Sequence, residues 1–326
     1  MDKVFVTRRI PQAGVDILEK YFKVEVNGEE RNLSKDEIIE NIKDTFGIVT
    51  MVSDKIDKEV MDSAENLKII ANYGVGINNV DIDYATRKKI LFTNTPGVLT
   101  QATAELAWGL IMAVARNIVQ ADKFTRSGEF TGFSPTLMLG KEFYSSTIGI
   151  IGMGRIGSSI ARMARYGFNM NVLYYNRSKS EKELVVDAKR VQLDELLSVS
   201  DIVVVSAPLN SESKHLINKE KFELMKNDAL FINVARGEVV DTDDLIYALE
   251  NNIIGGAGLD VYENEPDFDT RLAGFKNCTL LPHIGSATVE TREKMSKIVA
   301  NNIVSVYKGR CPDYTVNGGD LCPAKN

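Results

Sequence analysis

Short apolar runs alternate with amphipathic stretches along almost the whole chain, and this alternation predicts an α/β fold. In the first part, the predicted strands are Lys3–Thr7, Lys23–Val26, Gly47–Val52, Lys68–Ala71 and Ile90–Thr93. Amphipathic segments such as Lys35–Ile42 and Lys58–Ala64 separate these runs and are expected to be helices. The first part is therefore predicted to form a small doubly wound unit of parallel strands and helices.

A second alternation begins after an Ala-rich stretch and a loop. Residues 102–115 are apolar on most faces, which predicts a buried helix, and residues 127–140 are expected to form an extended loop. The strands predicted beyond the loop are Thr147–Ile151, Asn171–Tyr175, Asp201–Ser206, Ala229–Asn233, Gly256–Asp260 and Thr279–Leu281. A last helix is predicted over Glu290–Tyr307, with an irregular tail beyond Lys308. The last helix is expected to return to the first unit and complete it.

Composition narrows the class of protein. The chain has 326 residues, of which 44% are hydrophobic and 26% charged, and its net charge is −6. Mixed charges of this kind give no reason to expect nucleic acid or a membrane as partner. Three cysteines form no CxxC pair and no even framework, so we expect reduced thiols in a cytoplasmic protein and no metal site.

A glycine-rich motif marks the second unit as a dinucleotide-binding domain. Gly152, Gly154 and Gly157 form a GxGxxG pattern directly after a predicted strand and at the start of a predicted helix. This pattern allows a tight turn, a close approach of the backbone to a pyrophosphate, and close packing of helix on strand. We therefore predict two Rossmann-like doubly wound domains, a substrate domain (1–98 and 288–326) and an inserted dinucleotide-binding domain (99–287).

The end of the next strand favours one of the two nicotinamide dinucleotides. NAD enzymes usually place Asp or Glu there to bind the ribose 2′-hydroxyl, whereas this chain has Asn176, Arg177 and Ser178. Arg177 can bind a 2′-phosphate, and Asn176 and Ser178 offer neutral hydrogen bonds. NADP(H) is thus the expected cofactor, with NAD(H) as the alternative.

Three side chains that each follow a predicted strand suggest the chemistry. Arg236, Glu265 and His283 are expected at one carboxyl edge of one sheet, which is where α/β sheets bind ligands. Arg236 would bind and polarise a 2-oxo acid, and His283 would donate the proton that accompanies hydride transfer. Glu265 would orient the imidazole by a hydrogen bond to its other nitrogen. The second histidine, His215, is expected to be structural.

A further turn in the first unit suggests a carboxylate site. The glycines of Asn72–Asp81 leave the backbone N–H groups of Val75 and Gly76 free to point at one place. Such a nest suits a substrate carboxylate, although a tight turn without a ligand has the same pattern.

These motifs resemble those of the D-isomer-specific 2-hydroxyacid dehydrogenases, and among them most closely the glyoxylate and hydroxypyruvate reductases. The similar segments cover nearly the whole chain in order: Asn72–Asp81, Thr95–Val98 with Ala104-Glu105, Gly149–Gly157, Ser200–Leu209, Asn233–Gly237, Gly258–Pro266 and Pro282–Ser286. The resemblance implies a homodimer formed through the cofactor domain and the catalytic roles given above. It also implies cofactor contacts at Thr103, Arg155, Ile156, Pro208, Val234, Asp260 and Gly285.

One departure bears on the substrate. Many relatives have tryptophans in the loop before the second domain, where this chain has Phe130 and Phe133. A changed pocket puts glyoxylate itself in doubt, and the sequence does not name the acid. Two alternatives to an NADPH-dependent reductase stay open at this point. One is an NAD-linked D-2-hydroxyacid dehydrogenase of another acid, and the other is a dinucleotide-sensing binding protein of the corepressor kind.

Overall fold

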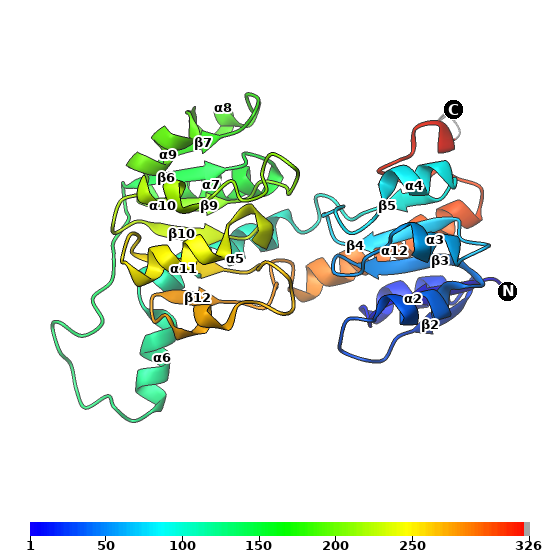
Figure 1. Ribbon diagram of the computed structural model, residues 1–326, viewed down its shortest axis with the longest axis horizontal. Coiled ribbons are helices and arrows are strands. Elements are labelled where there is room, and N and C mark those ends of the chain that lie inside the picture. The colour runs from blue at the N-terminus through cyan, green and yellow to red at the C-terminus, as the bar shows by residue number, and fades with distance from the viewer. Residues whose placement is uncertain (323–326) are drawn as a thin grey trace. The chain divides into compact units, whose positions relative to one another are not determined.

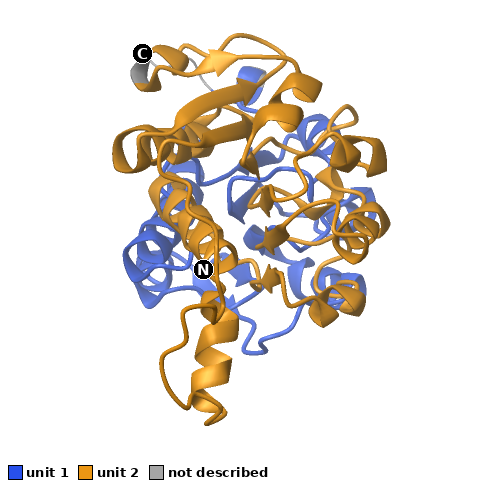
Figure 2. Ribbon diagram, turned by 90° about the vertical axis from the view of Figure 1, so that its left-hand side faces the viewer, with its two compact units in different colours: residues 1–99, 286–326 blue, residues 100–285 orange. Residues whose placement is uncertain are grey.

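The computed structural model describes residues 1–322, which form two compact units (Figures 1 and 2). Of these residues, unit 1 comprises 1–99 and 286–322, and unit 2 comprises 100–285. Each unit is built on one sheet in which every strand pair is parallel. The predicted α/β class with two doubly wound parallel sheets is therefore confirmed.

The sheet of unit 1 has five strands in the order β2-β1-β3-β4-β5. They are β1 (Lys3–Val6), β2 (Lys23–Val26), β3 (Thr45–Met51), β4 (Ile69–Tyr73) and β5 (Leu91–Thr93). The helices of the unit are α1 (Gln12–Leu18), α2 (Lys35–Ile42), α3 (Lys58–Asp62), α4 (Ile82–Arg87) and α12 (Val289–Tyr307). Apolar residues of α2 and α3 pack with Phe5, Ile48, Ile70 and Phe92 in the core of one face.

The last helix, α12, belongs to the first unit. The backbone of α1 at Gly14 approaches Ser296 of α12 so closely that an added Cβ would lie 2.5 Å from the Ser296 carbonyl oxygen. The Tyr73 hydroxyl at the end of β4 donates to the Arg292 carbonyl oxygen at 2.6 Å. The helix α12 therefore completes a sheet whose strands all lie in the first 93 residues.

The sheet of unit 2 has seven strands in the order β12-β11-β10-β9-β6-β7-β8. They are β6 (Thr147–Ile151), β7 (Asn171–Tyr175), β8 (Lys189–Arg190), β9 (Ile202–Val205), β10 (Leu230–Asn233), β11 (Gly256–Leu259) and β12 (Cys278–Leu280). After β6 the chain winds first to one side, through β7 and β8, and then to the other. The strand order therefore reverses between β6 and β9, and such switch points are where α/β sheets bind ligands.

Unit 2 contains seven helices longer than a 3-10 turn among its described residues, and all but α6 lie beside the second sheet or its loops. They are α5 (Thr100–Ala115), α6 (Ile118–Arg126), α7 (Arg155–Phe168), α8 (Glu183–Val186), α9 (Leu193–Val199), α10 (Lys219–Glu223) and α11 (Thr242–Glu250). Alternate strand residues point to opposite faces: Ile148 and Ile150 pack with α5 and α7, whereas Ile151 packs with α9, α10 and α11. Short 3-10 helices lie at Gly237–Val239 and Thr270–Gly274 in this unit, and at Gly319–Leu321 in unit 1.

The Ala-rich helix α5 lies in the core of unit 2, as predicted, but the following helix does not. Nine residues of α5 are buried, whereas α6 has no buried residue and leads away from the sheet with the loop that follows it (Figure 1). Among the described residues, no single helix is long and apolar enough to cross a membrane. Only α5 and α6 taken together pass that test, and they are bent by 63°.

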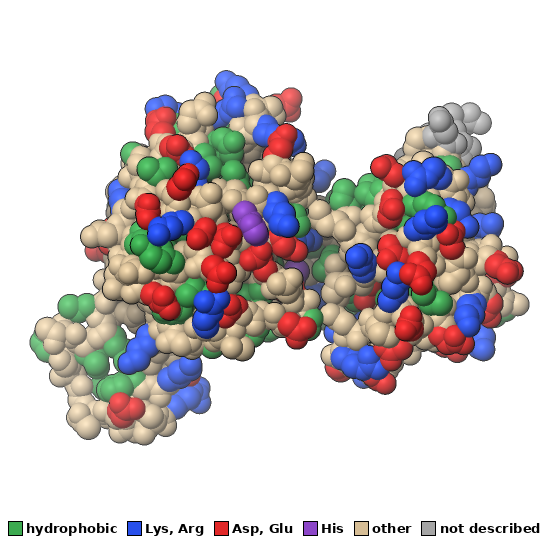
Figure 3. Space-filling view, in the orientation of Figure 1, with side chains coloured by type: hydrophobic (Ala, Val, Ile, Leu, Met, Phe, Trp, Pro, Cys, Tyr) green, Lys and Arg blue, Asp and Glu red, His purple; other side chains and the backbone are tan. Residues whose placement is uncertain are grey.

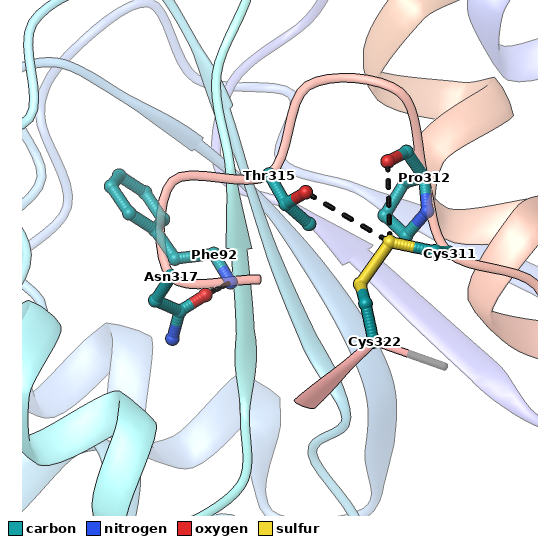
Figure 4. Close-up of a disulfide and its surroundings, with 6 residues drawn as sticks. All are labelled: Phe92, Cys311, Pro312, Thr315, Asn317 and Cys322. Carbon is teal, nitrogen blue, oxygen red and sulfur yellow. Dashed lines mark hydrogen bonds between the residues drawn. A yellow bond between two sulfur atoms is a disulfide. The ribbon is translucent and has the colours of Figure 1, made fainter. Parts of the chain in front are cut away.

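The tail after α12 pairs with the edge strand β5, which the sequence pattern does not predict. Thr315 forms an antiparallel bridge with Thr93, and Asn317 Oδ1 accepts the Phe92 N–H at 2.8 Å. A disulfide joins Cys311 to Cys322 across this segment (Figure 4). The prediction of three reduced thiols is therefore wrong for two of them, because folding of the tail on β5 brings these cysteines together. Cys278 is a buried free thiol, and a cytoplasmic location stays a prediction.

Basic and acidic side chains are intermixed over the face of each unit seen in Figure 3. Charged side chains of both units form ion pairs, such as Lys35 with Asp57 in unit 1 and Arg271 with Asp243 in unit 2.

Candidate active site

Three neighbouring strands bring the predicted catalytic side chains to one edge of the seven-stranded sheet. β10, β11 and β12 are adjacent, parallel and in register, so the segments that follow them leave the sheet on the same side. Arg236 follows β10, Glu265 lies in the loop after β11, and His283 lies in the turn after β12.

His283 and Glu265 form a hydrogen-bonded pair. Nδ1 of the imidazole lies 2.7 Å from Oε2 of the carboxylate, and the other carboxylate oxygen accepts the Tyr262 N–H at 2.9 Å. Both side chains are about one-third accessible to solvent, at 33% and 28%. Nε2 of His283 has no hydrogen-bond partner among residues 1–322, so this nitrogen is available to a ligand.

Local electrostatics keep Glu265 ionised. Burial alone would raise the pKa of this carboxyl group, but the hydrogen bond and charge of His283, the Tyr262 N–H and the charge of Arg236 together lower it below its usual value. The pair therefore consists of a carboxylate facing an imidazole that can accept or carry a proton.

Arg236 lies at a tight turn at the end of β10. Asn233 forms this turn with both ends of its side chain, accepting from the Ala235 N–H at 3.0 Å and donating to the Arg236 carbonyl oxygen at 2.9 Å. Nη1 of Arg236 donates to the Ala235 carbonyl oxygen at 2.6 Å. Burial lowers the pKa of the guanidinium, opposed by the charges of Glu265 and Glu238. Within the described part of the chain, Arg236 forms no ion pair, so its remaining donors can meet an anionic ligand.

A buried carboxylate holds the turn that bears His283. Asp260 accepts the Ile284 N–H at 2.7 Å with one oxygen and the Gly285 N–H at 2.8 Å with the other. These contacts stabilise a turn in which His283 has a φ of +53°, an uncommon conformation for a residue other than glycine. Burial raises the pKa of Asp260, opposed by the Ile284 N–H, the charge of His283 and the Gly285 N–H. Thr103 of α5 lies against Gly285, so three of the predicted cofactor residues meet here.

The glycine motif forms the turn from β6 into α7. Gly152 has a φ of +100°, and an added Cβ would lie 2.6 Å from the Ala207 backbone nitrogen. At Gly157, an added Cβ would lie 2.1 Å from the Gly152 carbonyl oxygen. Gly154, the residue before the first turn of α7, has no atom within 4 Å of that position. The helix N-terminus is thus open to a phosphate group, which fits a dinucleotide.

The loop after β7 is held by its own polar groups. Oδ1 of Asn176 accepts the Met153 N–H of the glycine loop at 2.8 Å, so this atom is already engaged. Arg190 of β8 donates to the Asn176 carbonyl oxygen at 2.9 Å and to that of Arg177 at 2.7 Å. Sequence reasoning missed Arg190 because it acts from 13 residues away on a strand of two residues.

Arg177 and Ser178 are exposed on this loop. Nη1 of Arg177 lies 3.0 Å from Oε2 of Glu212, and the two side chains are 72% and 64% exposed. An ion pair this exposed contributes little to stability, so Arg177 can turn to another anion at small cost. The sequence pattern did not indicate Glu212 because the pair joins segments that are 35 residues apart.

The predicted carboxylate nest in unit 1 follows β4. Asn72 donates to the Gly76 carbonyl oxygen at 2.7 Å, and Asn94 donates to that of Val75 at 2.9 Å. Among the described residues, the backbone N–H groups of Val75 and Gly76 have no acceptor, and the Val75 side chain is exposed. These two N–H groups therefore fit the proposed role of anion donors.

The other predicted residues of unit 2 lie near the ends of the same strands. Arg155 and Ile156 begin α7, Pro208 follows β9 and Val234 follows β10. Val234 is buried, whereas Arg155 and Pro208 are exposed. Phe130 and Phe133 lie in the loop after α6 and are 54% and 90% exposed within the single chain.

The chain is similar to known proteins over its whole length. Residues 108–285 match the family described as D-isomer specific 2-hydroxyacid dehydrogenase, NAD binding domain. A glyoxylate reductase of Thermococcus gammatolerans is 48% identical over 320 residues, which cover 97% of this chain and 96% of that protein. A similar structure is the NADPH-dependent glyoxylate/hydroxypyruvate reductase of Sinorhizobium meliloti in complex with NADP and malonate. It has a TM-score of 0.88 and 30% identity, and the match covers 100% of this chain and 99% of that one.

Proposed function

This chain belongs to the family of D-isomer-specific 2-hydroxyacid dehydrogenases, and we propose that it uses NADPH to reduce a small 2-oxo acid to the D-2-hydroxy acid. It is an NAD(P)-dependent oxidoreductase that resembles the glyoxylate reductases. The observation that carries the proposal is the His283–Glu265 hydrogen bond beside a partly buried arginine without an ion-pair partner among the described residues.

The side chains of unit 2 divide the work of the reaction. Arg236 directs its free donors at the substrate carboxylate and carbonyl oxygen, which draws electron density away from the carbonyl carbon. His283 holds a proton on Nε2 and gives it to the carbonyl oxygen as that oxygen gains negative charge. In the reverse direction the same nitrogen accepts the proton from the hydroxyl group.

Glu265 acts on His283 rather than on the substrate. Its carboxylate fixes the ring through Nδ1, so that Nε2 faces the ligand. In unit 1, we assign the N–H groups of Val75 and Gly76 to the substrate carboxylate.

The glycine loop and its surroundings fit a nicotinamide dinucleotide. The dinucleotide, when it is bound, supplies hydride to the substrate. Gly152, Gly154 and Gly157 leave room for its pyrophosphate at the start of α7, together with the backbone of Arg155 and Ile156. We assign further contacts to Thr103, Pro208, Val234, Asp260 and Gly285, which lie near the carboxyl ends of β9 to β12 or against them.

The preference for NADPH rests on the loop after β7. Asn176 stands at the strand end where a carboxylate would repel a 2′-phosphate, and Arg177 and Ser178 are exposed beside it. Because the Asn176 Oδ1 atom is engaged by the Met153 N–H, we assign the phosphate mainly to Arg177 and Ser178.

We also propose a homodimer formed through unit 2. The helix α6 has no buried residue in the single chain, and exposed apolar side chains lie on it and on the loop that follows, namely Ile118, Phe130, Phe133, Leu137 and Leu139. Exposed apolar side chains that gather on one segment, here α6 and the loop after it, are typical of a surface that is buried against another protein. Sedimentation equilibrium of the purified protein gives the subunit number directly.

One assay tests the proposed reaction. Purified protein is mixed with NADPH or NADH and a panel of 2-oxo acids, the absorbance of the reduced cofactor is followed, and the product is resolved on a chiral column. We expect a D-2-hydroxy acid and a larger kcat/KM with NADPH. Turnover with NADH alone would instead indicate an NAD-linked dehydrogenase. Binding of the dinucleotide without turnover on any acid would indicate a dinucleotide-sensing binding protein.

A further inference from the structure

A second cluster of one histidine and two carboxylates lies behind the loop that bears Glu265, and the proposed mechanism does not use it. Its members are His215, Asp241 and Glu263, which we call the His215 cluster. We propose that the His215 cluster holds Arg236 and Glu265 in their catalytic arrangement, so that its members are positioning residues of the active site. This proposal rests on the proposed function, because it concerns the residues that support the geometry of the proposed active site.

The contacts of the His215 cluster join three segments of unit 2. Nε2 of His215 lies 2.7 Å from Oε1 of Glu263, and Nδ1 lies 3.5 Å from Oδ2 of Asp241. The other oxygen of Glu263 accepts the Thr242 N–H at 3.0 Å, at the first turn of α11. The imidazole therefore connects the segment after β9 to the start of α11 and to the loop after β11.

The backbone of His215 adds a contact close to Arg236. Its N–H donates to the Glu238 carbonyl oxygen at 2.8 Å, and the next pair, Ile217 and Val240, forms a parallel bridge. Glu238 lies in the short 3-10 helix that directly follows Arg236. His215 thus uses its backbone to contact the segment that bears Arg236, and its ring to contact the loop that bears Glu265.

These two segments also touch each other directly. An added Cβ at Gly237 would lie 1.8 Å from the Tyr262 carbonyl carbon and 2.2 Å from the Glu263 nitrogen, so the two backbones pack with no space between them. The N–H of Tyr262 in turn binds Glu265. A shift of Glu263 would therefore move the neighbouring Tyr262, whose N–H supports Glu265, and the backbone next to Arg236 at the same time.

The charge on Glu263 favours the contacts that hold the His215 cluster together. Burial would raise the pKa of Glu263, but its hydrogen bonds to Thr242 and His215 lower it, so the carboxylate stays ionised. The charged or titratable groups around the imidazole are Glu263, Asp241 and, through the backbone contact, Glu238.

Variants of Glu263 test the proposal through both activity and geometry. Glu263→Ala removes both contacts and is expected to lower kcat about 100-fold, because a displacement of about 1 Å in an active site has that effect. The dissociation constant for NADPH should stay unchanged. Glu263→Gln keeps an acceptor for the Thr242 N–H and places an amide N–H₂ at the imidazole, where it can donate to unprotonated Nε2, so this variant should retain most of the activity. Asp267→Ala, at an exposed carboxylate of the same loop, serves as the control and should match the wild type.

A second readout does not require turnover. The chain has only two histidines, so the imidazole Cε1–H region of its NMR spectrum holds two resonances, which the variants His215→Asn and His283→Asn assign. If Glu263 positions Glu265, Glu263→Ala shifts the His283 resonance as well as that of His215. A merely local role shifts the His215 resonance alone.

The outcomes separate this proposal from the proposed function. An unmoved His283 resonance together with unchanged kcat in Glu263→Ala overturns the positioning role. Absence of turnover in the wild type overturns the proposed function, yet the NMR comparison still decides whether the His215 cluster positions the pair. If Glu263→Ala does not fold, His215→Asn removes the same link from the other side, and its effect on the His283 resonance decides.

Discussion

His283 Nδ1 lies 2.7 Å from Glu265 Oε2, and this contact determines which ring nitrogen is left for a substrate. Replacing His283 by Asn keeps a polar side chain but removes the group that can give up a proton at Nε2. We expect kcat to fall about 10²- to 10⁴-fold, as is typical when a general acid is lost. Stopped-flow and steady-state assays with NADPH give kcat, and cofactor fluorescence gives the dissociation constant, which should not change. A nearly fully active variant would mean that His283 is not the proton donor.

The lowered pKa of Glu265 has a consequence for stability. A carboxyl group whose pKa is lower in the folded state stabilises the protein above its unfolded-state pKa, and this contribution is lost as the pH falls through the folded value. The unfolded state has the ordinary value of 4.5. The difference in unfolding free energy between wild type and Glu265→Gln should thus be constant above about pH 5 and shrink below it. Thermal melts over a pH series measure this difference, and a difference that grows in acid would contradict the prediction.

Gly237 tests the close contact between the two catalytic segments. A methyl group at this position would overlap the Tyr262–Glu263 peptide, which cannot yield without moving the Glu265 loop. We expect Gly237→Ala to lower the unfolding free energy by about 1–3 kcal/mol, the usual range for overpacking, and to reduce kcat as well. Urea denaturation and steady-state kinetics measure the two effects. Gly274→Ala, where an added Cβ meets no atom within 4 Å, is the matched control.

Arg177 is expected to set the cofactor preference. Hydrogen bonds to charged groups contribute about 1.5–3 kcal/mol. Arg177→Ala should therefore reduce kcat/KM for NADPH by about 10- to 100-fold and leave the value for NADH unchanged. Glu212→Gln removes the carboxylate that holds Arg177 in the absence of cofactor, so this variant should raise kcat/KM for NADPH. If Arg177→Ala kept the same ratio of the two values, the phosphate would bind elsewhere.

The disulfide predicts a measurable difference between oxidised and reduced protein. Cys311 and Cys322 are 11 residues apart, and closing a loop of this size stabilises a protein by about 3 kcal/mol in the chain-entropy treatment. Cys311→Ser should lower the unfolding free energy by about that amount, whereas Cys278→Ser leaves the disulfide intact. Thiol titration in denaturant without reductant should find one free thiol in the wild type. Three free thiols would contradict the disulfide.

The sequence predicts most of this fold because most of its strands are short, apolar and buried, β2 and β8 being the exposed ones. The parallel sheets, the glycine turn at Gly152 and the buried helix α5 all follow from local patterns. The helix α6 escapes such reasoning because no residue of it is buried in the single chain. The strand β8 has only two residues, too few for a pattern.

The residues of the candidate site likewise divide into those that the sequence predicts and those that it does not. Arg236, Glu265 and His283 are recognisable because each residue follows a strand and the ends of parallel strands meet. The residues that support these three side chains cannot be recognised from strand ends in the sequence. Glu263 and His215 are 48 residues apart in sequence, and Arg190 reaches a carbonyl oxygen 13 residues away. Such contacts depend on how the chain packs, and no local pattern encodes them.

The return of α12 to unit 1 has a consequence for the order in which the protein folds during synthesis. Unit 2 is one continuous segment, so all of its strands are available once residue 285 has left the ribosome. Unit 1 has its five strands much earlier, yet lacks α12 until residue 307 has been made. Domains fold as units when their chain is complete. The domain that starts the chain is therefore the last to finish folding, and its sheet lacks part of its cover while unit 2 is being made.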